Sequence, residues 1–120
     1  AKCDDVFNFI PARITAYFMI ISSFILDLDG KNAFKIFLRD RFNHASPNSA
    51  QTEAVMAGAL DVALAGNAYY FGKLYEKKTI GDAIRKIKPD DIILANRMLY
   101  VAATISVILF AVIRILLQLI

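Results

Sequence analysis

Cysteine and histidine are almost absent from this sequence, and their scarcity excludes two classes of small protein. Cys3 is the only thiol and His44 the only imidazole among 120 residues. One cysteine cannot form an internal disulfide, and a single histidine offers no spacing of thiols and imidazoles that would hold a structural zinc ion. The chain is therefore neither a disulfide scaffold nor a zinc module.

Signals for nucleic-acid and nucleotide binding are missing as well. The net charge is +3, but the 14 basic and 11 acidic residues are interspersed, without an arginine-rich arm or an aromatic and basic repeat. The pair Gly30-Lys31 lacks the first glycine and the following serine or threonine of a Walker phosphate loop, and no dinucleotide fingerprint occurs. We expect no nucleic-acid partner.

The alternation of apolar and polar residues that is typical of strands persists nowhere, whereas apolar residues are abundant. They make up 58% of the chain, and the mean hydropathy of +0.49 is too high for an ordinary soluble domain. The sequence predicts an all-α fold of integral membrane helices with a helical polar loop region between them, forming one membrane-embedded unit over residues 1–120. Because the chain opens on Ala1 without a leader sequence, we expect it to begin inside a longer protein.

The clearest apolar segment covers residues 99–120, within a predicted helix over 92–120. Only Arg114 and Gln118 are strongly polar there, and the length suits a crossing of about 30 Å of hydrocarbon. Fourteen of its residues are Leu, Ile, Val or Phe. On an insertion scale these contribute about −6 kcal/mol, against at most about +3 for Arg114. The segment is predicted to be a transmembrane helix in which Arg114 either snorkels toward an interface or faces another helix or a cavity.

A second apolar run, residues 14–28, is shorter and includes Ser22 and Ser23. Pro11 suits the first turn of a helix, so the pattern predicts a helix over residues 11–28 that would cover about 27 Å. This helix either spans the membrane, re-enters it, or packs against protein.

Residues 29–91 form the polar loop region between the two apolar helices. The stretch 27–97 holds eleven of the basic residues, which favours the cytoplasmic side of a cell membrane and a multi-pass topology. Isoleucines within residues 80–87 predict a short amphipathic turn that ends at Pro89.

Asn48 and Gln51 resemble a capping box, and they predict a helix over about residues 50–65. This helix is rich in small residues. Ala54 and Gly58 lie four positions apart, a spacing that lets another helix approach closely.

Residues 39–73 combine polar side chains with small residues, and their chemistry allows more than one interpretation. His44 is a general base, a phosphate ligand or only a polar loop residue. Lys35, Arg39 and Arg41 either contact phosphate or reflect the basic bias next to a membrane. Among the carboxylates, Asp40 and Glu53 are the better candidates for magnesium because they are near His44 in sequence.

Four strings that follow one another carry a family resemblance. They are DDVFNFIPARITA at residues 4–16, RDRFNHASPN at 39–48, EAVMAGAL at 53–60 and AGNAYYFGK at 65–73. In this order and spacing they resemble the adenosylcobinamide-phosphate synthases, the CobD/CbiB family. The resemblance covers about residues 1–72. It departs at Ser49-Ala50 and Ala65-Gly66, where the family more often has Ala-Gly and paired glycines, and family members extend further upstream.

The resemblance implies an ATP-dependent ligase of cobalamin biosynthesis. Such an enzyme joins the carboxylate of a corrinoid, adenosylcobyric acid, to the amine of aminopropanol phosphate or a related amino alcohol. The resemblance implies that the carboxylate is phosphorylated before the amine attacks, which requires cations around phosphate and a group that takes the amine proton. ATP and magnesium are the implied cofactors. A homo-oligomer or an association with other late cobalamin-pathway membrane enzymes is also implied.

The resemblance also suggests roles for individual residues. The cations expected to bind phosphate oxygens are Arg13, Arg39 and Lys73. The expected catalytic residues are His44, Glu53 and Asp40. The two carboxylates would hold magnesium or orient the amine, and the histidine would act as a base or a phosphate contact.

Two further features of the sequence allow alternative interpretations. Ser46, Asn48 and the amides after Pro47 form either an anion site at a helix start or a simple cap. Tyr69 and Tyr70 either stack on the corrin face or are interfacial aromatics of a membrane protein.

The position of Arg13 relative to His44 depends on the helix that separates them. If residues 14–28 cross the membrane, the two side chains lie on opposite sides, so either this helix re-enters or the following loop folds back. The alternative function is a non-enzymatic membrane regulatory or sensory protein of the related β-lactamase-induction branch. A generic membrane subunit is a third reading.

Overall fold

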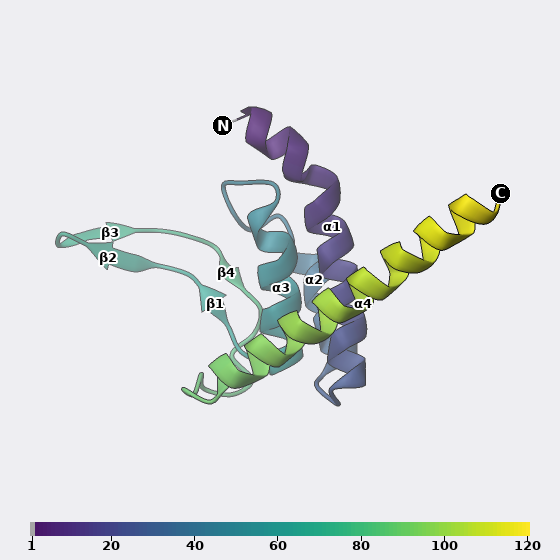
Figure 1. The fold of residues 1–120 in the computed structure, drawn as a ribbon. Coiled ribbons are helices and arrows are strands. Elements are labelled where there is room, and N and C mark those ends of the chain that lie inside the picture. Colours follow the sequence, from purple (N-terminus) through teal and green to yellow (C-terminus); the bar gives the residue numbers. More distant parts are fainter. Residues whose placement is uncertain (1) are drawn as a thin grey trace.

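A computed structural model describes residues 2–120 and shows a mostly helical chain (Figure 1). Within these residues the helices are α1 (Lys2–Ile25), α2 (Gly30–Asp40), α3 (Ser49–Leu60) and α4 (Asp91–Leu119). The short strands are β1 (Leu64–Ala65), β2 (Ala68–Tyr70), β3 (Lys73–Tyr75) and β4 (Thr79–Ile80). The predicted all-α class is confirmed for the bulk of the chain, with the strands as a local exception.

The first helix is longer than the sequence predicts. Instead of starting at Pro11, α1 begins nine residues earlier and carries the proline inside it. Proline lacks an N–H, so the carbonyl of Phe7 loses its helical partner, but the helix continues on both sides. The helices α1 and α4 are the two in the described part of the chain that are long and apolar enough to cross a membrane, judged by length and composition.

Two helices end in the same way, at an aspartate in the left-handed conformation. Asp27 has φ 60° after α1, and Asp61 has φ 58° after α3. The amides that follow close the helix ends, because Leu28 N–H donates to the Ser23 carbonyl at 2.9 Å and Val62 N–H to the Ala57 carbonyl at 3.0 Å. This Schellman-type end stops α3 at residue 60, so the predicted extension to residue 65 is wrong.

The helix α2 lies inside the region that the sequence reads as polar loop. Its start is capped by Asp29, whose carboxylate accepts a hydrogen bond from Asn32 N–H at 3.1 Å. Ala33, Ile36 and Phe37 are buried on one face of the helix. Their spacing is that of an amphipathic helix that packs on protein.

The capping box predicted for α3 is not formed. The Asn48 side chain makes no hydrogen bond to the first turn of the helix. Gln51 Nε2 instead donates to the carbonyls of Pro47, at 3.1 Å, and Arg41, at 3.2 Å. Gln51 therefore secures the loop that precedes α3.

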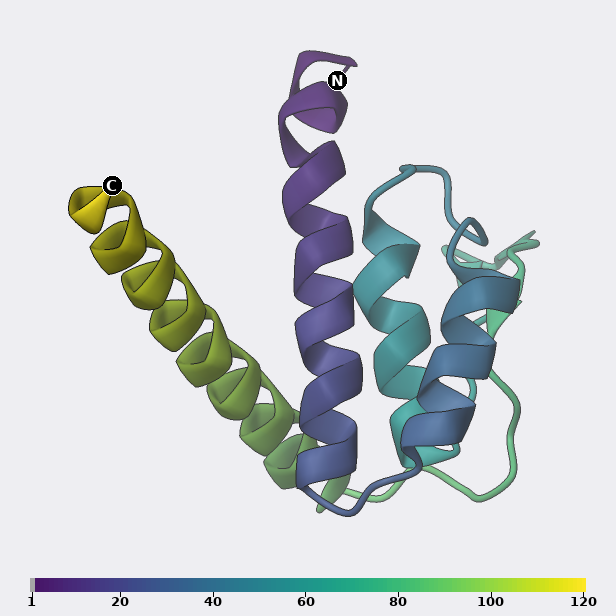
Figure 2. The same cartoon turned by 90° about the vertical axis from the view of Figure 1, so that its right-hand side faces the viewer.

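The helices α1, α2 and α3 lie side by side, and α4 crosses α1 and then diverges from it (Figure 2). The main core contains the buried residues Ala16, Met19, Ile20, Ala33, Phe37, Val55, Ala59, Met98 and Ala102. An edge-to-face contact between Phe18 and Phe110, with ring centroids 6.5 Å apart, continues the contact between α1 and α4. Beyond this contact the apolar side chains of α4 are exposed.

The strands form two short antiparallel pairs that the sequence does not predict. β1 pairs with β4, and β2 pairs with β3 to form a hairpin. The predicted amphipathic turn over residues 80–87 is also wrong, because Ile80 is buried in β4 while Ile84 and Ile87 are exposed and not helical.

The direction of the chain decides the relation between Arg13 and His44. α2 runs back along α1, so the loop over residues 41–48 returns to the N-terminal half of α1 (Figure 2). Arg13 Nη1 accordingly donates to Asn48 Oδ1 at 3.3 Å. The loop folds back, and α1 does not separate Arg13 from the HASPN segment.

Candidate functional site

A polar pocket of about 360 Å³ lies between the N-terminal half of α1 and the start of α3. Its lining residues are Asp4, Asp5, Asn8, Pro11, Ala12, Thr15, Ser46, Asn48, Ser49 and Thr52. They come from two of the strings that carry the family resemblance and from the helix turn that follows the second. The pocket therefore brings together segments about forty residues apart in sequence.

Asn48 holds the two segments together. Its Nδ2 donates to the backbone carbonyl of Asp5 at 2.9 Å, and its Oδ1 accepts from Arg13 Nη1. Ser46 adds a second connection, because its hydroxyl donates to Asp5 Oδ1 at 3.3 Å. The Asn48 side chain makes these contacts instead of capping α3.

The α1 side of the pocket is organised within the helix itself. Asn8 Nδ2 donates to Asp4 Oδ1 at 2.8 Å. The Arg13 guanidinium lies 3.5 Å from the centre of the Phe9 ring, and its Nη1 also donates to the Phe9 carbonyl at 2.8 Å. Arg13 thus lies at the rim of the pocket, where one hydrogen bond connects it to the lining residue Asn48.

The chemical character of the pocket follows from its lining. Two carboxylates, Asp4 and Asp5, occur among hydroxyls and amides, and no lysine, arginine or histidine is among the lining residues. Such a surface favours a cation or a protonated amine over an anion. A phosphate group would find its counter-charge at Arg13, outside the pocket.

His44 lies close in sequence but faces a different hollow. Its Nδ1 accepts a hydrogen bond from Ser46 N–H at 2.9 Å, so the neutral imidazole carries its proton on Nε2. It shares a hollow of about 370 Å³ with Glu76, Lys77 and Lys78. The histidine is exposed there, on a surface whose charges are mostly basic.

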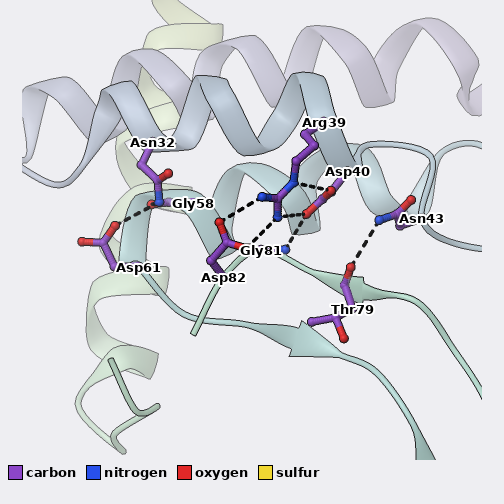
Figure 3. A network of polar contacts seen from close by, with 9 residues as sticks. All are labelled: Asn32, Arg39, Asp40, Asn43, Gly58, Asp61, Thr79, Gly81 and Asp82. Atoms are coloured by element: carbon purple, nitrogen blue, oxygen red, sulfur yellow. Dashed lines mark hydrogen bonds and ion pairs between the residues drawn. The ribbon is translucent and has the colours of Figure 1, made fainter. Parts of the chain in front are cut away.

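Arg39 and Asp40 belong to a polar network at the end of α2 (Figure 3). Arg39 forms paired hydrogen bonds with the carboxylates of Asp40 and Asp82, over distances of 2.8 to 3.0 Å. Asp40 Oδ2 also accepts from Gly81 N–H at 2.8 Å. The Arg39 guanidinium, followed by the Gly81 amide, holds the pKa of Asp40 below its usual range despite burial. Both residues therefore connect α2 to the segment after β4.

Glu53 lies apart from this network. It lines a mostly apolar hollow with Thr15, Met19 and Leu99, among others. Within residues 2–120 no group of three or more His, Cys, Asp or Glu side chains is placed to hold a metal ion. The structure does not bring Asp40 and Glu53 together, so these two carboxylates do not fit a shared magnesium site.

The remaining predicted residues lie on the β2–β3 hairpin. Tyr69, Tyr70 and Lys73 belong to it, and the hairpin projects away from the helices (Figure 1). Of the predicted phosphate ligands, Arg39 is paired with two aspartates and Lys73 is on the hairpin, so only Arg13 adjoins the pocket. Ser46 and Asn48 are the other predicted site residues that the pocket includes.

Sequence reasoning missed the lining residues of α1. Asp4, Asp5 and Asn8 have no predicted role of their own, although the resembling string opens with two adjacent acids and an amide at helical spacing. The signal that could have found them is the acidic pair itself. A carboxylate pair next to an apolar helix needs a polar environment.

Fold and pocket together define a class, that of helical proteins in which apolar helices frame a polar pocket. The profile of the family described as CobD/Cbib protein matches residues 1–99, and the chain belongs to this CobD/CbiB family. The predicted resemblance is confirmed. No solved structure was found to match the chain.

Curated relatives agree with this family. The chain is similar to the cobalamin biosynthesis protein CobD of Clostridium perfringens, with 55% identity over 120 residues, 100% of this chain and 38% of that protein. It is 50% identical over 118 residues to the CobD of Streptococcus sanguinis, covering 98% of this chain and 37% of the relative. It is 45% identical over 117 residues to the CobD of Citrobacter koseri, with the same coverages of 98% and 37%. The chain thus spans under two fifths of the length of these relatives.

Proposed function

We propose that this chain is the part of a cobalamin-biosynthesis ligase that binds the amino alcohol during amide formation. The relatives are named for cobalamin biosynthesis, and the chain is similar to them over nearly its whole length. The single observation that carries the proposal is the pocket in which the DDVFN and HASPN segments meet. The proposed reaction joins adenosylcobyric acid to aminopropanol phosphate, or to a related amino alcohol, at the expense of ATP.

The charge of the pocket suits the amine of this substrate. Asp4 and Asp5 attract the ammonium form, and the hydroxyls of Thr15 and Ser46 offer further hydrogen bonds. Arg13, at the rim, provides the positive charge for the phosphate of the same molecule. An amino alcohol phosphate carries both charges in one small molecule, and Asn48 connects Arg13 at the rim to the Asp5 backbone carbonyl.

Amide formation requires two steps at the corrinoid carboxylate. A carboxylate oxygen attacks the γ-phosphorus of ATP, which releases ADP and leaves an acyl phosphate. The bound ammonium first loses one proton to water, and the neutral amine nitrogen then attacks the acyl carbon. Inorganic phosphate departs, and a second N–H proton passes to a base. Asp5 is the proposed base because its carboxylate lines the pocket. ATP with magnesium supplies the phosphoryl group, and no residue of this chain is assigned to the metal.

Membrane localisation is part of the same proposal. The helix α4 is long, apolar and mostly exposed, and α1 passes the same length and composition test. A corrinoid pathway enzyme anchored in this way would hold the amino alcohol pocket close to the membrane surface.

The proposal is tested with the full-length protein in membranes supplied with adenosylcobyric acid, aminopropanol phosphate and ATP. The expected result is a corrinoid amide formed together with ADP. If no product forms with any nucleotide, the ligase assignment is wrong, and the result favours a regulatory membrane protein.

Substitutions separate the pocket from the rest of the chain. Asp5→Asn keeps an oxygen that accepts from Ser46 but removes the charge, so we expect kcat/KM for the amino alcohol to fall by about 100-fold. His44→Ala and Glu53→Ala test two of the three catalytic residues predicted from the sequence. Asp90→Asn is the matched control, because it removes an exposed carboxylate outside the pocket. Equal loss in Asp5→Asn and Asp90→Asn at normal membrane yield would argue against the pocket.

A further inference from the structure

The β2–β3 hairpin is held by backbone pairing and stands away from the helices (Figure 1). Tyr70 pairs with Lys73, and the two residues between them form the turn. Both turn residues have positive φ, 54° at Phe71 and 75° at Gly72, which is the geometry of a type I′ hairpin. Glycine suits its position, but phenylalanine in a left-handed conformation is unfavourable.

Phe71 gains nothing from packing that would offset this conformation. Its relative exposure of 105% means that no described residue covers the ring. A Cβ placed on the neighbouring Gly72 would likewise meet no atom within 4 Å. An asparagine or glycine at residue 71 would make the same turn with less strain, so the aromatic tip serves something other than folding of these residues.

The rest of the hairpin combines exposed aromatic rings with lysines. Tyr69 and Tyr70 are 74% and 50% exposed. The Tyr70 ring meets the Tyr75 ring edge-to-face at 5.5 Å, and the Nζ atoms of Lys77 and Lys73 lie 5.7 and 5.9 Å from these two rings. These side chains thus pack on each other along the hairpin, while the Phe71 ring at its tip is fully exposed.

We propose that this hairpin, residues 67–78, is an interfacial anchor whose aromatic tip enters the headgroup region of an anionic membrane. Tyrosine and phenylalanine favour the boundary between headgroups and acyl chains, and lysines are drawn to anionic lipid. The segment carries three lysines against one acid, Glu76. This inference goes beyond the ligase function and does not depend on it.

The composition of the hairpin distinguishes lipid from protein as its partner. Lysine is depleted from the cores of protein interfaces, whereas here Lys73 and Lys77 lie directly over the tyrosine rings. The chain also contains two helices of membrane-crossing length and composition, which favours a bilayer as the partner. Lipid headgroups accommodate this mixture of lysines and rings.

The depth of the tip is measured in the full-length protein, with its native cysteines replaced and Phe71→Cys labelled with an environment-sensitive fluorophore. The protein is reconstituted in phosphatidylcholine vesicles with and without phosphatidylglycerol. We expect quenching by spin-labelled lipid and protection from aqueous iodide at residue 71. The matched control is Glu76→Cys, further from the tip, which should be quenched less by lipid and more by iodide.

The contribution of charge is measured by combining Lys73→Gln, Lys77→Gln and Lys78→Gln with the label at residue 71. The partition of the tip into anionic vesicles should fall by about fivefold for each lysine removed, and its dependence on phosphatidylglycerol should disappear. Because these side chains are exposed and the label has no core neighbour, the helical fold should be unchanged.

Three outcomes would contradict the proposal that the hairpin is a membrane anchor. Iodide access at residue 71 in both vesicle types would place the tip in water. Protection from iodide without quenching by lipid would show that another part of the protein covers it. Protection that appears only after a corrinoid is added would assign the tyrosines to stacking on that ligand.

Discussion

At the scale of single residues, the carboxylate of Asp61 illustrates how local environment changes charge. It ends α3 in a left-handed conformation, and its Oδ1 accepts from Asn32 Nδ2 at 3.0 Å (Figure 3). Partial burial is the main cause that raises the pKa of Asp61, and the neighbouring Asp29 carboxyl raises it further. Asn32 opposes these two effects by hydrogen bonding to the ionised form.

Replacement of Asp61 by asparagine should stabilise the protein at neutral pH. A carboxyl whose folded pKa is raised destabilises the fold while ionised, and this cost disappears as the pH falls through the folded pKa toward the unfolded value. Asparagine keeps the acceptor for Asn32 and tolerates the left-handed conformation. Thermal unfolding in detergent should show a gain on the order of 1 kcal/mol at neutral pH. The gain should vanish below the unfolded pKa of about 4.

Asp27→Asn is the appropriate control for this measurement. Asp27 has the same left-handed conformation but is exposed. An equal gain in both variants, independent of pH, would attribute the effect to backbone conformation instead of charge.

Some of the candidate site could be predicted from the sequence, and some could not. Arg13 is predicted as a phosphate-binding cation, and Ser46 and Asn48 are predicted separately as an anion site or a cap; the structure connects all three through Asn48. The separation of His44 from the pocket depends on the path of a short loop around Pro47. No periodicity encodes that path, so sequence adjacency to Ser46 was misleading.

At the scale of elements, the contact between α2 and α3 depends on the absence of a side chain at Gly58. A Cβ there would lie 2.6 Å from the Asn32 carbonyl oxygen and 2.7 Å from the Ala33 Cα. Both atoms belong to the α2 backbone, which cannot rotate away as a flexible side chain can. The prediction that small residues in this helix permit close approach agrees with this geometry.

Gly58→Ala should therefore destabilise the protein although alanine is the better helix former. The expected loss is about 3 kcal/mol, the upper end of the cost of overpacking, since separation of the helices would also disturb the Asn32 bond to the Gly58 carbonyl. Chemical unfolding of the full-length protein in detergent measures the change. Thr52→Ser, a conservative change on the same helix, should alter the unfolding free energy little. A Gly58→Ala variant as stable as the parent would show that α2 and α3 are not packed this closely.

The elements that the sequence failed to predict share a cause. The helix α2 was hidden by its charged residues, although Ala33, Ile36 and Phe37 follow helical spacing. The strand pairs are two or three residues long, too short for alternation to be recognised. The ends of α1 and α3 depend on aspartates in a conformation that glycine usually adopts. Local patterns predicted the long apolar helices, while tertiary contacts determined the short elements.

At the scale of the whole molecule, the two long apolar helices differ in what they contact. The C-terminal half of α1 packs against the other helices, whereas α4 contacts α1 from Met98 to Phe110 and then diverges (Figure 2). The apolar surface of α4 beyond this contact is large, as expected of a helix that faces lipid. The membrane assignment can therefore be tested most directly on α4.

Leu109→Asp should prevent α4 from inserting into the membrane. The residue lies near the middle of the apolar segment and is exposed, so its replacement removes little packing. The remaining thirteen apolar residues contribute about −5 kcal/mol, while Arg114 and the new aspartate together cost about +6 kcal/mol. A reporter placed directly after Ile120, with all upstream segments of the protein retained, measures the inserted fraction, which should fall from nearly complete to a minority. Leu109→Ala is the control and should insert normally. If Leu109→Asp inserts as well as the parent but lowers the yield of folded protein, α4 is covered by protein and is not a lipid-facing span.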